Sequence, residues 1–324
     1  MGRRKNVIDA DLFEREVNIP KQLETDYDAC LNAFIKRCKI RNLSEDTVKY
    51  YWQKLTLFRD LLEQQRISTD PTKMSLEIIQ NNIILYLMDN GNYKASSINA
   101  LLRAVRAFYN YLYENGMIEH NPVRKLALVK AQKKVIETFS RDQLLRLFDQ
   151  PNTATFTGFR DLTMLQLFVE TGIRLREMSD LMVRDIRWED AQILVKGKGA
   201  KDRLVPFQPK MRRQLRKYVM IRGDIACDHL FVNIDNHPLS RRQIQDRVRK
   251  YGRMANIKNV RCSPHTLRHT FAKLSVQNGA DVFALQAVLG HESLDMVRNY
   301  VNLFSNEVAD AHRKFSPLES LIKR

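Results

Sequence analysis

Hydrophobic positions between residues 27 and 116 recur at steps of three and four, with polar residues between them. One such series is Leu55, Phe58, Leu61 and Leu62. This period is typical of amphipathic helices, and four of them fill the segment. Ser44 and the pair Ser96 and Ser97 mark two helix starts, while Gly116 and Asn121-Pro122 end the series. The pattern therefore predicts an all-helical N-terminal half.

The pattern changes between residues 185 and 207 to three short apolar runs. They are Ile186 and Trp188, then Ile193, Leu194 and Val195, then Leu204, Val205 and Phe207. Glu189-Asp190 and Gly197-Lys198-Gly199 separate the runs as turns, which predicts a three-stranded antiparallel sheet.

Helical signals surround this sheet. Ser140 is a suitable N-cap for a helix over residues 141–149, and an apolar helix over residues 160–170 ends at Gly172. Further helix signals are Ser240, Ser263-Pro264 with Gly279 as a stop, Gly290 and Ser293. The fold class is thus mainly α, with an all-helical domain followed by an α+β domain.

The chain has 324 residues, more than one hydrophobic core usually holds, which indicates two domains. We expect them at residues 1–122 and 139–324, joined by a basic linker over residues 123–138. The linker carries Arg124, Lys125, Lys130, Lys133 and Lys134. A solvated face of a helix is the alternative interpretation.

The amino-acid composition indicates what kind of partner the protein binds. Lys and Arg number 54 against 37 Asp and Glu, for a net charge of +17, so a polyanion is the natural partner. The four cysteines are far apart and lack C-x-x-C spacing, which favours reduced thiols. No signal peptide and no membrane span is evident, so we expect a cytoplasmic, nucleoid-associated protein without a membrane partner.

Candidate chemistry is concentrated in residues 263–269. His265 and Arg268 lie three apart on one helix face, with His269 one turn from His265. A titratable imidazole beside a permanent cation suits proton transfer near a phosphate. A helix that merely carries surface polar residues is the alternative for an isolated motif of this kind.

The context resembles the tyrosine site-specific recombinase family, which includes phage integrases and Xer-like proteins. His265 and Arg268 match its H-x-x-R motif, Thr171-Gly172-Ile173-Arg174 its T-G-x-R motif, residues 197–203 its G-K-G-x-K-x-R hairpin, and Leu289-Gly290-His291 its L-G-H motif. Tyr300 follows His291 by nine residues, as the nucleophile does in the family. The resemblance spans Ser140 to about Leu303. It departs at Met296 and Val297, where many relatives carry threonines.

The resemblance implies a catalytic set and a reaction. The set is Arg174, Lys198, His265, Arg268, His291 and Tyr300, with Glu177 in support and Lys201 as the alternative to Lys198. Tyr300 would attack a phosphodiester, giving a 3′-phosphotyrosine and later a Holliday junction. Fixed arginines stabilise the charge that develops on phosphate oxygens. His265 is the candidate proton acceptor and Lys198 the general acid. No metal and no other cofactor is required.

The resemblance also implies the partners. They are double-stranded DNA with a pair of inverted binding elements, and further copies of the chain, four on two DNA sites. An accessory DNA-bending protein is left open. Expected DNA contacts are Lys130, Lys133, Lys134, Lys201, Arg203, Arg241 and Arg242. The tail over residues 310–324 is a candidate for exchange between protomers, or a simple disordered tail. The short segment before the first helix leaves little room for an arm-binding domain. Integration, transposon recombination and dimer resolution stay open.

Other chemistries fit less well. His265 and His269 have the spacing of a zinc helix but lack its carboxylate, and Gly197-Lys198-Gly199 lacks the Lys-Ser/Thr ending of a phosphate-binding loop. Cys262 and His265 at a helix start rarely give the geometry of a cysteine protease. Two rival functions share the basic charge: a catalytically silent DNA-binding protein and a type IB topoisomerase.

Overall fold

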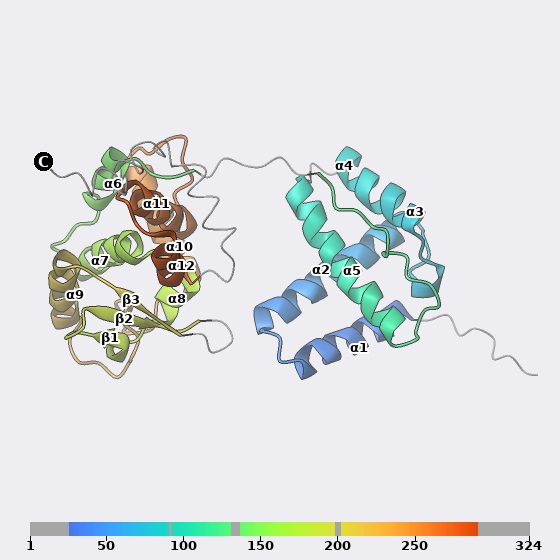
Figure 1. Cartoon of the computed structure of the whole chain (residues 1–324), viewed down its shortest axis with the longest axis horizontal. Coiled ribbons are helices and arrows are strands. Elements are labelled where there is room, and N and C mark those ends of the chain that lie inside the picture. Colours follow the sequence, from blue (N-terminus) through green and yellow to red (C-terminus); the bar gives the residue numbers. More distant parts are fainter. Residues whose placement is uncertain (1–25, 91–92, 131–136, 198–201, 291–324) are drawn as a thin grey trace, which may run out of the picture. The chain divides into compact units, whose positions relative to one another are not determined.

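The computed structural model describes residues 26–90, 93–130, 137–197 and 202–290. The chain divides into two compact units, residues 1–134 and residues 135–324 (Figure 1). Each unit has its own hydrophobic core. Among the described residues, no helix combines the length and the apolar character needed to cross a membrane.

The N-terminal unit is helical, as the hydrophobic period predicts. Its elements are α1 (Tyr27–Ile40), α2 (Glu45–Gln64), the 3₁₀ turn η2 (Pro71–Lys73), α3 (Leu76–Ile78), the π-helical turn η3 (Ile79–Leu85), α4 (Tyr86–Asn90) and α5 (Ala95–Glu114). The last begins at Ala95, before the predicted serines. Ser44 caps α2 by accepting a hydrogen bond from the Thr47 backbone N–H. Phe58 and Phe108 are fully buried in the core.

Residues 123–130, which we expected to form part of a linker, pack on this unit instead. Val123 and Leu126 are buried in its core. The Asn99 side chain on α5 bonds both the backbone N–H and the carbonyl of Val129, each at 2.8 Å. The apolar residues at three-residue steps therefore outweigh the neighbouring charges.

The other end of the expected linker packs on the second unit. The Glu137 carboxylate accepts a hydrogen bond from the Arg261 backbone N–H at 2.9 Å. Phe139 is buried, and its N–H donates to the hydroxyl of Thr270 at 2.9 Å. Residues 131–136, between the two packed segments, lie outside the described part of the chain.

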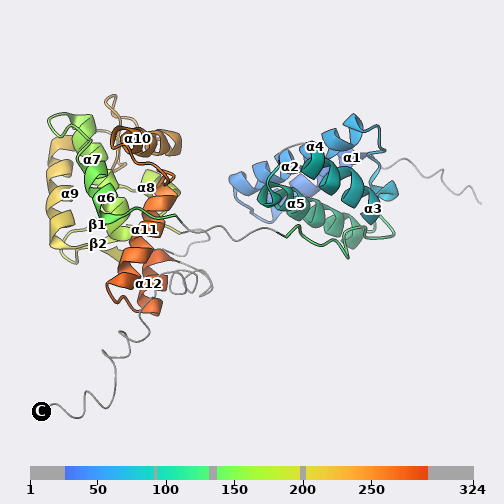
Figure 2. The same cartoon turned by 90° about the horizontal axis from the view of Figure 1, so that it is seen from above.

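The second unit combines helices with a small sheet (Figure 2). Its elements are α6 (Arg141–Phe148), α7 (Phe156–Thr171), α8 (Leu175–Asp180), the 3₁₀ turn η4 (Val183–Asp185), β1 (Ile186–Arg187), β2 (Gln192–Val195), β3 (Arg203–Pro206), α9 (Pro209–Arg222), α10 (Arg241–Met254), α11 (Pro264–Gln277) and α12 (Val282–Leu289). The strands are antiparallel in the order β1-β2-β3, with Val195 opposite Arg203. The predicted fold class is confirmed.

Three helices of the second unit differ from the prediction, and one of them is the short α8, which was not predicted. The helix expected from Arg160 begins at Phe156, because the Thr155 hydroxyl accepts the Gly158 N–H and starts it a turn earlier. Helix α9 was not predicted, although Pro209 in its first turn and Gly223 at its C-cap are ordinary boundary signals. Its many basic residues hid the buried stripe that contains Met211, Leu215 and Tyr218.

Candidate active site

The T-G-x-R segment is a tight turn between α7 and α8. Gly172 ends α7 with a left-handed backbone, at φ +60°. A Cβ atom there would lie 2.3 Å from Cδ1 of Phe271, so both the backbone and the packing require glycine. The turn brings Arg174 to the N-cap position of α8, where its side chain is 44% exposed.

Glu177 is the buried centre of an ion-pair cluster. Its carboxylate accepts the Arg174 backbone N–H at 2.7 Å and a guanidinium nitrogen of Arg174 at 2.9 Å. Arg203, from β3, donates to both carboxylate oxygens at 2.8 Å. Burial alone would raise the pKa of Glu177, but the bonds from Arg203 and Arg174 lower it to about 2. Glu177 is therefore ionised and fixes both arginines.

Arg268 lies on α11 and is buried. Its guanidinium donates to the carbonyl of Gly172 at 2.6 Å and to that of Leu289 at 2.8 Å. Arg174 donates to the carbonyl of Gly290, the next residue, also at 2.8 Å. The C-terminal end of α12 thus brings together the two arginines that the motifs nominate, and the chain continues from there to His291.

Helix α11 carries His265 in its first turn. The Ser263 hydroxyl caps this helix by accepting the Thr266 N–H at 3.2 Å, and Pro264 occupies the first turn. His265 is exposed, and its ring lies 4.1 Å from that of His269 between centroids. Partial burial, then the charges of Arg268 and Arg261, lower the pKa of His265. A neutral imidazole at pH 7 can accept a proton.

The half-buried His269 makes the stability of the second unit depend on pH. Burial, then His265 and Arg268, lower the pKa of His269 from 6.5 to about 4. Between pH 6.5 and 4, His269 is protonated in the unfolded chain but not in the folded chain. The free energy of unfolding should therefore fall as pH falls. Glu177 adds to this pH dependence of stability only below about pH 4.5, because its carboxyl begins to bind a proton near that pH in the unfolded chain.

We expect His269→Gln to flatten this dependence between pH 6.5 and 4, measured by urea unfolding at several pH values. The fluorescence of Trp188, in a Trp52→Phe background, follows the second unit alone. An unchanged slope would contradict the assignment of a depressed pKa to His269.

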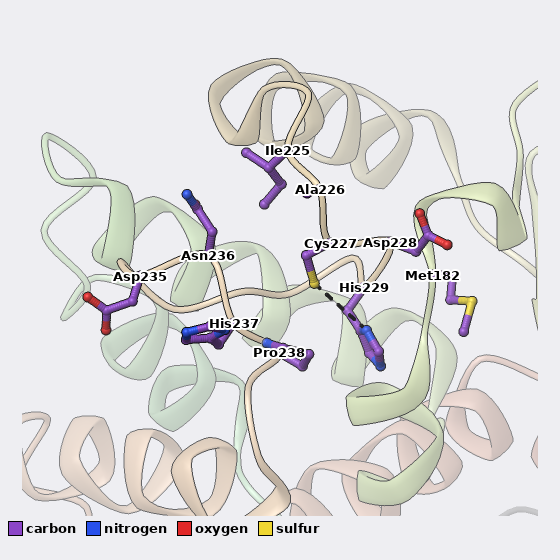
Figure 3. A pocket seen from close by; sticks show the side chains of 10 residues that line it. All are labelled: Met182, Ile225, Ala226, Cys227, Asp228, His229, Asp235, Asn236, His237 and Pro238. Atoms are coloured by element: carbon purple, nitrogen blue, oxygen red, sulfur yellow. Dashed lines mark hydrogen bonds between the residues drawn. The ribbon is translucent and has the colours of Figure 1, made fainter.

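A pocket of the second unit has a different lining from this cluster. Within the described ranges, no group of three His, Cys, Asp or Glu side chains could hold a metal ion. The pocket lies between the segments 225–229 and 235–238, beside Met182 (Figure 3). Cys227 and His229 line it, 3.9 Å apart, but no predicted site residue does.

The structure places the remaining predicted residues as follows. Lys133, Lys134, Lys198, Lys201, His291 and Tyr300 lie outside the described residues, so their assignments stay predictions. Lys130, Arg241 and Arg242 are exposed. Arg203 was expected to contact DNA; its guanidinium is turned inward onto Glu177, and its side chain is only 12% exposed. Two-residue alternation along β3 indicates this, since Arg203 shares a strand face with the buried Val205.

Sequence comparisons match parts of both units to known protein families. Residues 137–307 match the phage integrase family, and residues 31–116 match the N-terminal SAM-like domain of phage integrases. The tyrosine recombinase XerC of Thermodesulfovibrio yellowstonii is 34% identical over 225 residues, which are 67% of this chain and 74% of that protein. The tyrosine recombinase XerD of Staphylococcus epidermidis strain RP62A is 29% identical over 286 residues, covering 86% of this chain and 94% of that protein.

Solved structures share the fold. A lambda integrase tetramer bound to a Holliday junction matches with a TM-score of 0.71 and 18% identity, over 89% of this chain and 80% of that chain. XerH recombinase bound to a palindromic difH substrate matches with a TM-score of 0.69 and 20% identity, over 89% and 85%. The matched segment of 171 residues (137 to 307) is more than half of the 324-residue chain, and the chain therefore belongs to the phage integrase family.

Proposed function

We propose that this chain is a site-specific DNA recombinase that cuts and rejoins DNA through a phosphotyrosine at Tyr300. The observation that carries the proposal is that Arg174, at the N-cap of α8, and Arg268, on α11, meet at the C-terminal end of α12. Two fixed guanidiniums at one place suit a phosphodiester whose nonbridging oxygens gain charge during attack.

The reaction is a transesterification in two reversible halves. The Tyr300 oxygen attacks phosphorus and gives its proton to His265, while the bond from phosphorus to the 5′ oxygen breaks. The departing 5′ oxygen takes a proton from Lys198 and leaves as a hydroxyl. In the second half, a 5′ hydroxyl attacks the phosphotyrosine and releases Tyr300. Bond energy is retained in the ester, so the step needs no nucleotide.

The proposed substrate is duplex DNA with two inverted elements, acted on by a tetramer. Support comes from the lambda integrase tetramer on a Holliday junction and from XerH on its palindromic substrate, which share the fold. The N-terminal unit and the segment that follows it would hold one side of the DNA. An accessory DNA-bending protein remains part of the proposal, and integration, excision and resolution are all compatible with this site.

The basic segment after the N-terminal unit gives a salt-dependent prediction. Replacing Lys130, Lys133 and Lys134 by glutamine should weaken DNA binding and reduce the slope of log K against log salt by about 2 to 3, since each phosphate contact contributes about 0.9. Fluorescence anisotropy at several salt concentrations measures the slope. A slope equal to that of the wild type would contradict DNA contact by these lysines.

The proposed function is tested with a nicked suicide substrate taken from the DNA beside the gene. Wild-type protein should form a covalent adduct that survives denaturing electrophoresis, because the nicked fragment diffuses away and prevents religation. Tyr300→Phe should bind the same DNA and form none. An adduct with both proteins would assign the attack to another residue. A wild type that binds its site specifically and never forms an adduct would support a silent DNA-binding protein instead.

A further inference from the structure

Three arginines from three elements cap the C-terminal end of α12. Arg203 donates through Nε to the carbonyl of Val288 at 2.8 Å, Arg268 to that of Leu289, and Arg174 to that of Gly290. The last carbonyls of a helix have no partner within the helix and carry its negative dipole end, so cations are favoured there. The three bonds fix where α12 ends and the chain toward His291 begins.

Arg203 differs from the other two arginines in its contacts. Its two terminal nitrogens hold both oxygens of Glu177, while its Nε holds Val288. Its side chain is 12% exposed, against 44% for Arg174. All three nitrogens of this guanidinium therefore have partners within the protein. Through these bonds Arg203, on β3, links Glu177 on α8 with Val288 on α12.

The fit around Arg203 is close. Gly290 adopts φ +63°, and a Cβ atom at that position would lie 3.0 Å from Cδ and 3.1 Å from Cζ of Arg203. The glycine thus lets the end of α12 approach the guanidinium. A lysine at position 203 has one nitrogen in place of the planar fork and cannot make the same three directed bonds.

We propose that Arg203 is a positioning residue for strand cleavage: it acts through Glu177 on Arg174 and through Val288 on the end of α12, and it does not contact DNA. The inference rests on the proposed function. Without the guanidinium of Arg203, Glu177 loses two of its hydrogen bonds and the carbonyl of Val288 loses its donor. A displacement of the phosphate-binding arginines of about 1 Å is enough to slow a reaction by about 100-fold.

The test compares Arg203→Met and Arg203→Lys with the wild type in single-turnover cleavage of the suicide substrate at saturating protein. We expect Arg203→Met to cleave about 10 to 100 times more slowly, at the size of effect expected for misplaced catalytic groups, with unchanged DNA affinity and salt slope. Arg203→Lys should recover only part of the rate. Arg187→Met, an exposed arginine of β1, is the matched control and should cleave normally. If the methionine variant fails to fold, the lysine variant carries the same comparison.

Two further readouts separate positioning from a general structural role. In a Glu177→Gln background, Arg203→Met should slow cleavage by less than about threefold, because residues that act as a unit are not additive. Among the described residues, Arg203 and Arg174 are the charged groups that lower the pKa of Glu177. Without Arg203 the pKa of Glu177 should rise, so the variant should lose cleavage at acidic pH where the wild type does not.

The outcomes are distinct. A wild-type rate in Arg203→Met and Arg203→Lys would overturn the inference, as would fully additive losses with Glu177→Gln. A weaker affinity with a salt slope reduced by about 1 would make Arg203 a DNA contact. If the wild type and Arg187→Met both form no adduct, the proposed function fails and this inference with it. An adduct with both, combined with an undiminished rate in the two Arg203 variants, overturns the inference alone.

Discussion

Replacing Arg268 by alanine should slow strand cleavage about 10²–10³-fold, the scale expected for the loss of one donor to a transition-state oxyanion. The guanidinium is buried and already directed by the carbonyls of Gly172 and Leu289. Such a fixed donor needs no reorganisation when charge develops on the phosphate. DNA affinity should change little, because one phosphate contact among many is lost.

Arg174→Ala should be compared with Arg268→Ala in both cleavage rate and stability. We expect a similar loss of cleavage, because Arg174 meets the same helix end as Arg268. The stability of the two variants should differ, since Arg174 is 44% exposed whereas Arg268 is buried. Arg268→Ala leaves two carbonyls without their donor, at a cost of about 1–3 kcal/mol for a buried group. Single-turnover rates equal to the wild type in either variant would contradict that arginine's catalytic assignment.

Asp161→Asn should lower the free energy of unfolding of the second unit by about 3–5 kcal/mol, as expected when one member of a buried ion pair is removed. Asp161 and Arg160 are both fully buried on α7 and pair at 2.7 Å. The other Asp161 oxygen accepts the Tyr251 hydroxyl at 2.8 Å. Asparagine keeps the shape but leaves the Arg160 charge without its counterion.

The measurement is urea unfolding followed by Trp188 fluorescence with Trp52 replaced by phenylalanine. Asp246→Asn is the matched control, because Asp246 pairs with Arg249 at 2.9 Å on the exposed side of α10. Exposed pairs contribute little, so this variant should unfold almost as the wild type does. A loss of less than about 1 kcal/mol for Asp161→Asn would show that the buried pair is not a principal support of the second unit.

Local signals were enough to predict much of the fold. Ser140, Ser240 and Ser263 each cap the helix that was expected to follow them. The turn residues also predicted the three strands, because a hairpin needs little information from outside itself. Helix α9 was missed because its polar face is so basic that the average hydropathy concealed a regular buried stripe.

The site was predictable only in part. The motifs nominate Arg174 and Arg268, and the structure brings both to the end of α12. The role of Arg203 was not predictable from its charge, because a basic residue beside a turn is as compatible with DNA contact as with an internal ion pair. Its contacts with Glu177 and Val288 favour the internal ion pair, and these partners are distant in the sequence.

Identification of the residue that becomes attached to DNA tests the central claim most directly. A covalent complex trapped with suicide substrate is digested with trypsin and nuclease, and the nucleotide-bearing peptide is sequenced by mass spectrometry. We predict the peptide from Asn299 to Arg313, with the remaining nucleotide on Tyr300 through a 3′-phosphate. Attachment to any other residue, or a linkage through a 5′-phosphate, would contradict the account.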